Sequence, residues 1–194
     1  KNKKKKTNNF ITYISDYEKQ PAPVKQKKNF EKFILEVLSE FCKKYKKKLV
    51  IALKCNRKDK VISCQSELNY YKNLSKNFYT YKSSSYKIVN DSILSVSLSS
   101  SLGLEMLSRG SKVLFLPYLN KISKKIFCQY TNKKNLPFIH DNFHKRKIFL
   151  KLKYLMNLKE NSWKNQINKF NLKIHFDKNN KILNKICSKI ILNK

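Results

Sequence analysis

The sequence predicts an α/β fold in which helices cover a parallel, Rossmann-like sheet, and three observations support this prediction. Residues 49–53 and 113–116 are short, continuously apolar runs, which are typical of strands buried on both faces. Strand-like and helix-like segments alternate from residue 10 to residue 116, as βαβ units require. The chain has 194 residues, 41% of them hydrophobic, which is enough for one domain with a substantial core.

The first βαβ unit is predicted within residues 10–53. β-branched and aromatic residues favour a strand at 10–15. Apolar side chains at helical spacing then predict a helix from residue 30 to residue 41, with Asn29 as its cap. The apolar run 49–53 is the second strand.

The next elements are shorter. Residues 66–75 predict a helix with Glu67 in its first turn, and residues 77–81 predict a third strand. Serines at 83–85 can cap a brief helix at 86–90, because a serine side chain accepts a hydrogen bond from the first helical turn. This helix leads into the central segment of the chain.

The central segment predicts a strand, a serine-rich turn, a helix and a strand. Residues 93–98 alternate apolar residues with serine, and residues 112–116 form an apolar run before a proline. The chain has two glycines, and both lie here. Gly110 suits a helix C-cap, whereas Gly103 indicates that another group approaches the backbone closely. We expect a sheet of at least five strands, with 93–98 central and 112–116 beside it.

Beyond residue 117 the pattern becomes less regular. Residues 135–140 predict a loop, and Pro137 argues against a helix that would pair His140 with His144 as metal ligands. No metal site is therefore expected. Apolar spacing predicts later helices around 148–156, 163–170 and 182–191. The expected parts are a basic linker (1–9), a Rossmann-like domain (10–145) and a C-terminal helical extension that packs across it (146–194).

The net charge of +32 reflects lysine far more than arginine, because Arg57, Arg109 and Arg146 are the three arginines among 44 basic residues. Sites that read phosphates with bidentate geometry favour arginine, and the lysines are spread along the chain. We therefore do not expect dedicated nucleic-acid binding. Attraction to anionic membranes or polyanions does follow from such a charge.

Cysteine usage and hydropathy favour a cytoplasmic protein, with peripheral contact to the inner face of the membrane as a further expectation. The five cysteines form no CxxC pair, which argues against a zinc site and a disulfide framework. The sequence has no run of 18 apolar residues, so no transmembrane helix is predicted.

The serine-rich turn at 99–101 predicts a site for phosphate. The first N–H groups of a helix have no internal partner and carry partial positive charge, and serine hydroxyls add donors. The predicted ligands are the side chains or amides of Ser99, Ser100, Ser101, Leu102 and Gly103. The alternative is that Ser101 is an ordinary N-cap on a solvated helix.

Other polar residues follow the predicted strands and are expected at the same edge of the sheet, where parallel α/β folds bind ligands. Glu105, one helical turn beyond the serines, can accept hydrogen bonds from ribose or sugar hydroxyls. Lys54 and Arg57 would neutralise charge. Ser15 and Tyr81 also follow strands.

The chain resembles the C-terminal half of GT-B glycosyltransferases, and in particular bacterial surface-carbohydrate and capsule biosynthesis proteins. Residues 95–116, with the motif Ser-Ser-Leu-Gly-Leu-Glu, are similar to the serine-glycine-glutamate segment of that family. Glu67 with Tyr70 and Tyr71 resembles an acidic-aromatic helix upstream of it. Trp163 and the segment 176–183 resemble the closing segment of the family.

This resemblance implies that residues 10–145 bind a nucleotide-sugar donor, with its phosphates at the serine-rich turn and without a cofactor. It also implies that a carbohydrate or lipid-linked acceptor, and often the catalytic base, are bound by an N-terminal domain that these residues lack. The chain alone would then bind donor weakly and transfer no sugar, and no catalytic residue is assigned. Two alternatives remain: a nucleotide-sugar epimerase on the same fold, and a nonenzymatic protein that binds polyanions or membranes.

Overall fold

The computed structural model describes residues 9–17, 25–54, 61–117 and 136–169. The predicted basic linker, the residue Arg57, most of the 118–145 region and the last predicted helix lie wholly or largely outside these ranges. The described elements are, in chain order, β1 (Phe10–Ile14), α1 (Lys25–Lys44), β2 (Lys48–Ala52), α2 (Val61–Leu74), α3 (Ser85–Asp91), β3 (Leu94–Ser97), α4 (Ser101–Ser108), β4 (Val113–Phe115), α6 (Lys145–Asn157) and α7 (Glu160–Asn168).

The four strands form a single parallel sheet in the order β2-β1-β3-β4. The predicted fold class is therefore confirmed, and β3 lies inside the sheet with β4 beside it, as expected. The interior strands β1 and β3 are buried along their whole length, and so is the edge strand β4. Both interior strands need cover on both faces.

The prediction of at least five strands is wrong for the described residues. The expected strand at 77–81 is reduced to one bridge, in which Tyr79 exchanges two backbone hydrogen bonds with β2, of 2.8 Å to Leu49 and 2.9 Å from Ile51. Tyr79 is half exposed, so little apolar burial favours a longer pairing there. Conversely, the predicted loop at 135–140 adds a bridge from Ile139 to Phe115 on the outer edge of β4.

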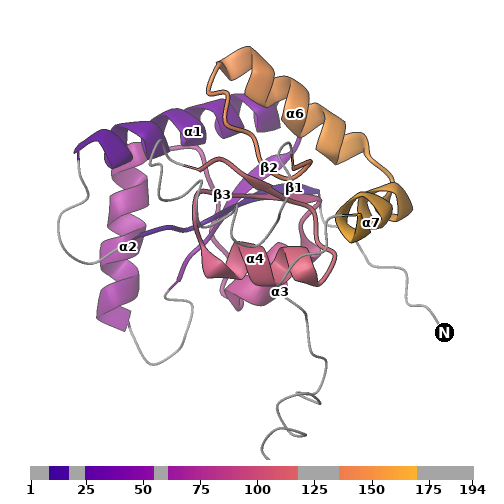
Figure 1. Cartoon of the computed structure of the whole chain (residues 1–194). Helices are drawn as coiled ribbons and strands as arrows, with labels where there is room; N and C mark the ends of the chain where they lie inside the picture. Colours follow the sequence, from indigo (N-terminus) through magenta and orange to yellow (C-terminus); the bar gives the residue numbers. More distant parts are fainter. Residues whose placement is uncertain (1–8, 18–24, 55–60, 118–135, 170–194) are drawn as a thin grey trace, which may run out of the picture.

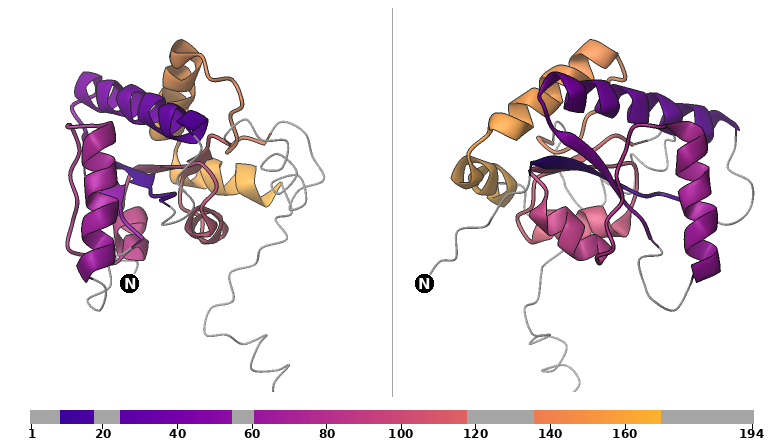
Figure 2. Two further views of the ribbon diagram at one scale, coloured as in Figure 1. Left: turned by 90° about the vertical axis from the view of Figure 1, so that its left-hand side faces the viewer. Right: turned by 180° about the vertical axis from the view of Figure 1, so that it is seen from behind.

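Helices cover both faces of the sheet (Figure 1). α1 and α6 lie over one face, and α3 and α4 lie over the other. α2 packs beside α1 at the end of the sheet away from α6, and α7 follows α6 (Figure 2). α6 and α7 bury Ile148, Leu152, Leu155 and Trp163 in the same core as the strands.

Two helices begin earlier than predicted. α1 begins at Lys25, so Asn29 lies within the helix and does not cap it, and α2 begins at Val61. No glycine or proline interrupts either added turn, so nothing in the sequence stops the helix there. Glu67 consequently lies in the middle of α2, where it is completely buried.

Gly103 allows α4 to pack closely on the sheet, and Gly110 ends that helix. Gly110 has a φ of +85°, which confirms the predicted C-cap conformation. A Cβ on Gly103 would lie 2.9 Å from Cε1 of Phe115 and 3.1 Å from Cβ of Ser97. The group that approaches Gly103 is thus the sheet itself. This glycine lets the first turn of α4 pack directly on β3 and β4.

A side chain at Gly103 should therefore destabilise the fold. We expect Gly103→Val to lower the free energy of unfolding by about 1–3 kcal/mol, because the fully buried Phe115 would have to shift to admit the new side chain. Urea denaturation measures this loss, and Ser101→Ala on the exposed side of the same helix is the matched control. Equal stability of the two variants would contradict the packing role of Gly103.

Candidate functional site

The candidate site lies where two neighbouring strands, β1 and β3, end. The chain passes from β1 to β2 on one side and later returns to β3 on the other side of β1. In open parallel sheets, ligands bind in the crevice at such a reversal, outside the carboxyl ends of the strands. Asp16 follows β1 and Ser99 follows β3. The Ser99 hydroxyl donates a 2.8 Å hydrogen bond to Oδ2 of Asp16, which joins the two strand ends.

The first turn of α4 supplies unpaired donors next to this bond. Ser100, and not Ser101, is the N-cap residue, with φ −65° and ψ 131°, and its side chain accepts no capping hydrogen bond from the helix. The Ser100 N–H donates to Oγ of Ser97 (3.1 Å), and the Gly103 N–H donates to the Ser100 carbonyl (2.9 Å). Among the described residues, the N–H groups of Ser101 and Leu102 have no acceptor. Of the five predicted phosphate ligands, Ser101 and Leu102 thus have free amides, whereas the Ser99 hydroxyl and the N–H groups of Ser100 and Gly103 already donate to protein acceptors.

Two lysines border the same edge of the sheet. Nζ of Lys27, on α1, lies 3.4 Å from Oδ2 of Asp16, whose side chain is almost fully buried. Lys54 follows β2, and its Nζ donates a 2.8 Å hydrogen bond to the carbonyl of Tyr17. Lys54 therefore lies at the carboxyl edge as predicted, whereas Arg57 lies outside the described residues. The Tyr81 ring packs edge-on against Phe10, the first residue of β1 and thus at the amino edge of the sheet.

A buried carboxylate, Glu31 of α1, lies below the site and accepts three tyrosine hydroxyls. Tyr13 and Tyr71 lie 2.7 and 2.9 Å from its Oε1, and Tyr70 lies 2.6 Å from its Oε2. Glu31 is 1% exposed, so these bonds take the place of water. Hydrogen bonds to an ionised group are stronger than neutral ones, which lets the carboxylate stay buried.

A second buried carboxylate, Glu67 of α2, reaches the carboxyl end of β1. Its Oε1 accepts the hydroxyl of Ser15 and, at 2.9 Å, the backbone N–H of Lys54. The Tyr71 hydroxyl lies 3.0 Å from Oγ of Ser15 and accepts the N–H of Asp16 at 3.1 Å. Through these bonds α2 fixes the backbone from which Asp16 projects.

The same network controls the ionisation of the tyrosines. Burial raises the pKa of Tyr13 and Tyr71 well above the ordinary value, and the negative charge of Glu31 raises it further. Burial and the hydrogen bond to Glu31 likewise raise the pKa of Tyr70. All three hydroxyls therefore keep their protons near neutral pH and act as donors.

Glu105 is turned toward α3. The Tyr86 hydroxyl donates a 2.5 Å hydrogen bond to its Oε2, and the Arg109 guanidinium lies over the Tyr86 ring, 5.2 Å from the centroid. One carboxylate oxygen of Glu105 is thus occupied by the protein. Its predicted role toward ribose or sugar hydroxyls would use the other oxygen.

Asp16, Lys27 and Glu31 also belong to this site and are not predicted from the sequence. Asp16 directly follows the first strand, so its place at the carboxyl edge could have been noted. Glu31 gave no such signal, because it stands in a lysine-rich helix and looks like a solvated residue. Its burial depends on three tyrosines from other elements.

Two further predictions concern metals and membrane spans. In the part of the chain that the structure describes, no three His, Cys, Asp or Glu side chains gather as metal ligands. None of the helices within the described ranges is long and apolar enough to cross a bilayer.

Comparison with known proteins gives the family. The family described as "putative O-antigen biosynthesis protein" matches residues 1–191, and the chain belongs to that family. No curated protein matches it. Among solved structures, it is similar to the one titled "Crystal Structure Analysis of the Glycotransferase of kitacinnamycin", with 10% sequence identity and a TM-score of 0.48. That match covers 86% of this chain and 39% of the other, so the chain spans about two fifths of that structure's length.

Loss of the charge on Glu31 should destabilise the fold. We expect Glu31→Gln to lower the free energy of unfolding by about 2–4 kcal/mol, because the amide nitrogen cannot accept a tyrosine hydroxyl. The matched control is Glu36→Gln, an exposed position on the same helix, which should change stability by less than about 0.5 kcal/mol. Urea denaturation of both variants tests this, and equal losses would refute a structural role for Glu31.

Stability should also fall in alkaline solution. The pKa of Tyr71 is raised in the folded state, so above about pH 10 the unfolded chain releases a proton that the folded chain keeps. Burial raises the pKa of Cys42 from 9.0 to about 12, so the loss of stability begins at about pH 9. Each such proton can remove up to about 1.4 kcal/mol per pH unit.

Because lysines lose charge in the same range, the informative comparison is the parent against Tyr71→Phe. Urea midpoints between pH 8 and pH 11.5 should fall less steeply for Tyr71→Phe. Identical slopes for the two proteins would contradict the raised pKa of Tyr71.

Proposed function

We propose that this member of the O-antigen biosynthesis family binds a nucleotide-sugar donor for sugar transfer in surface polysaccharide synthesis. The observation that carries the proposal is the pair of free amides, Ser101 N–H and Leu102 N–H, at the strand reversal between β1 and β3. A helix start with free donors favours phosphate, and a neighbouring carboxylate favours sugar hydroxyls. A nucleotide sugar contains both groups in one ligand.

In this proposal the diphosphate binds at the start of α4. The amides of Ser101 and Leu102 and the Ser101 hydroxyl donate to its oxygens. The N-cap Ser100 shapes this turn through its extended backbone. Ser99 would contribute only after its hydroxyl turned away from Asp16, since a hydroxyl donates one hydrogen bond.

Asp16 is then available for the sugar or the ribose. Its carboxylate accepts hydrogen bonds, and release of the Ser99 hydroxyl would leave a position that a sugar hydroxyl can fill. Glu105 would accept a second hydroxyl through the oxygen that Tyr86 does not occupy. Lys27, Lys54 and Arg57 would offset the negative charge of the diphosphate.

The transfer step that this arrangement favours is electrostatic. Breaking the bond between the sugar and the diphosphate leaves negative charge on the departing phosphate oxygen. Fixed amides and lysines at that position stabilise the developing charge without reorganising, which is a large contribution in many enzymes. The acceptor, carbohydrate or lipid-linked, and the base that takes its proton are assigned to a further domain, in line with the resemblance to GT-B enzymes.

A single substitution can test the contribution of the Ser101 backbone amide separately from that of its side chain. Ser101 is the first residue of α4 and the preceding residue is extended, so Ser101→Pro fits the helix start and removes the N–H. We expect Ser101→Pro to weaken donor binding at least about ten-fold while the melting temperature stays equal or rises. Ser101→Ala, which keeps the amide, should bind with a smaller loss.

The measurement is a thermal-shift screen of the parent against UDP-, GDP- and CMP-sugars, followed by calorimetric titration of the variants. If Ser101→Pro binds the selected donor as tightly as the parent, the donor is not held at the start of α4. If the parent binds none of these donors, the assignment of a nucleotide-sugar site is wrong.

A further inference from the structure

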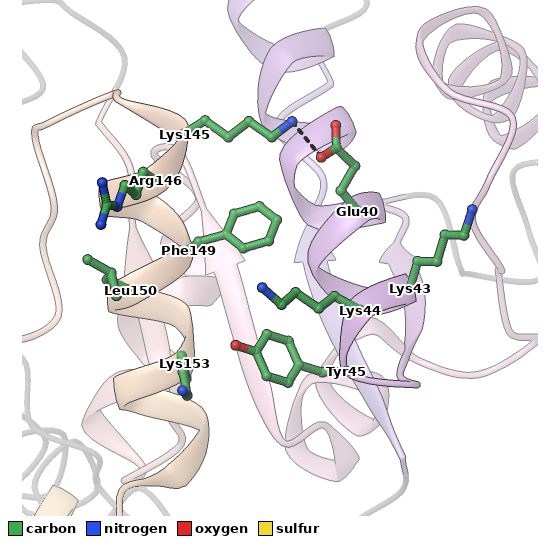
Figure 3. Close-up of a pocket in the computed structure, with 9 residues that line it drawn as sticks. All are labelled: Glu40, Lys43, Lys44, Tyr45, Lys145, Arg146, Phe149, Leu150 and Lys153. Atoms are coloured by element: carbon green, nitrogen blue, oxygen red, sulfur yellow. Dashed lines mark ion pairs between the residues drawn. The ribbon is translucent and has the colours of Figure 1, made fainter.

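A basic groove lies between the end of α1 and the first half of α6, on the face opposite α3 and α4 (Figure 3). Its volume is about 900 Å³. Glu40 is the one acidic residue among those that line it, and its Oε2 pairs with Nζ of Lys145 at 2.5 Å. The cations that line the groove are Lys43, Lys44, Lys145, Arg146 and Lys153. The groove thus keeps a strong positive charge after its one ion pair is counted.

Apolar side chains lie among these cations. Phe149 and Tyr45 point into the space between the two helices, whereas Leu150 points out from α6 on the side away from α1 (Figure 3). Leu150 is 60% exposed, and Tyr154, one helical turn further on, is 46% exposed. They are among the few large hydrophobic residues that the described part of the chain exposes.

Other residues of α6 already fill the core beneath this helix, so Leu150 and Tyr154 are not needed there. Ile148, Leu152 and Leu155 are buried in the same core cluster as the strands and already anchor the helix. On the outward side, exposed Leu150 lies among cations, and Tyr154 stays 46% exposed although its hydroxyl accepts a 2.7 Å hydrogen bond from Nε2 of Gln166 on α7. Basic amphipathic helices of this kind lie in the headgroup layer of membranes, with the apolar side chains at the acyl boundary.

We propose that the α1–α6 groove and the outward side of α6 dock on an anionic lipid bilayer. The cations match the charge of the headgroups, and Leu150 and Tyr154 match the acyl boundary. A soluble polyanion would use the cations but would gain nothing from the exposed leucine. The bilayer is therefore the occupant that accounts for both features.

The groove lies away from the candidate donor site. Tyr45 precedes the start of β2, at the amino edge of the sheet, whereas Ser99 and Asp16 lie at the carboxyl edge. Docking through the groove leaves the carboxyl edge open to ligands. The docking proposal does not depend on donor binding, so the two proposals can fail separately.

The test is partition of the whole chain, residues 1–194, onto sedimented vesicles. Vesicles of phosphatidylcholine with about one third phosphatidylglycerol are compared with pure phosphatidylcholine, at low salt. Each cation near an anionic surface contributes roughly five-fold to partition, so Arg146→Gln with Lys153→Gln should lower it by about 25-fold. Leu150→Ser should lower it by roughly five- to ten-fold, with no change in charge.

The matched control removes the same charge elsewhere. Lys72 lies on α2, and Lys82 lies two residues before the N-cap of α3; both are exposed. Lys72→Gln with Lys82→Gln should change partition by no more than about two-fold, because charges more than a Debye length from the surface are screened. All variants are exposed-site changes, and thermal melts verify that each is folded.

Three outcomes would overturn the proposal. The first is equal loss in the two charge variants, which would mean that total charge and not the groove drives binding. The second is unchanged partition of Leu150→Ser with full displacement by heparin, which would identify a polyanion site. The third is equal partition of the parent onto the neutral and the anionic vesicles.

Discussion

The structure depends on two glutamates buried beneath the carboxyl edge of the sheet. An ionised carboxylate removed from water costs several kcal/mol unless hydrogen bonds replace its hydration. Glu31 gains three tyrosine hydroxyls, and Glu67 gains a serine hydroxyl and a backbone amide. The donors come from β1, α2 and the end of β2. The two carboxylates can therefore stay buried only when these elements are assembled in one arrangement.

These buried hydrogen bonds also fix the backbone beneath the candidate site. Ser15 and the amide of Asp16 are held from below, through Glu67 and the Tyr71 hydroxyl. Asp16 is then presented to Ser99 from a backbone that has little freedom. Gly103 performs the corresponding task for α4, because it lets the helix start lie directly on Phe115. Both sides of the candidate site are thus positioned by core contacts.

Much of the fold could be predicted from the sequence, because strands buried on both faces leave continuous apolar runs. β2 and β4 were predicted on that pattern, and β3 on its apolar-serine alternation before a turn. The helix end at Gly110 was predictable because a left-handed residue there favours glycine. The strand at 77–81 was not correctly predicted, since its composition suits a strand but its position at the edge of β2 buries too little of Tyr79.

The candidate site was predictable only in part. The serine turn carries a local signal, since serines before a helical pattern mark a helix start. Glycine is required at position 103 because Phe115, on the strand after α4, packs against it. The sequence does not indicate that contact. Glu31 and its tyrosines are separated by up to 40 residues, so their association follows from the packing of α1, α2 and β1 and from no local motif.

The hydrogen bond between Ser99 and Asp16 joins segments 83 residues apart in sequence, and it has a consequence for selectivity. An inorganic phosphate that draws the Ser99 hydroxyl to itself leaves the buried carboxylate of Asp16 with one donor fewer. A ligand that carries an anionic group and a hydroxyl a few ångströms apart can replace both halves of the broken bond. If the proposed donor binds here, the site would therefore disfavour simple anions and favour molecules in which a phosphate and a polyol are covalently joined.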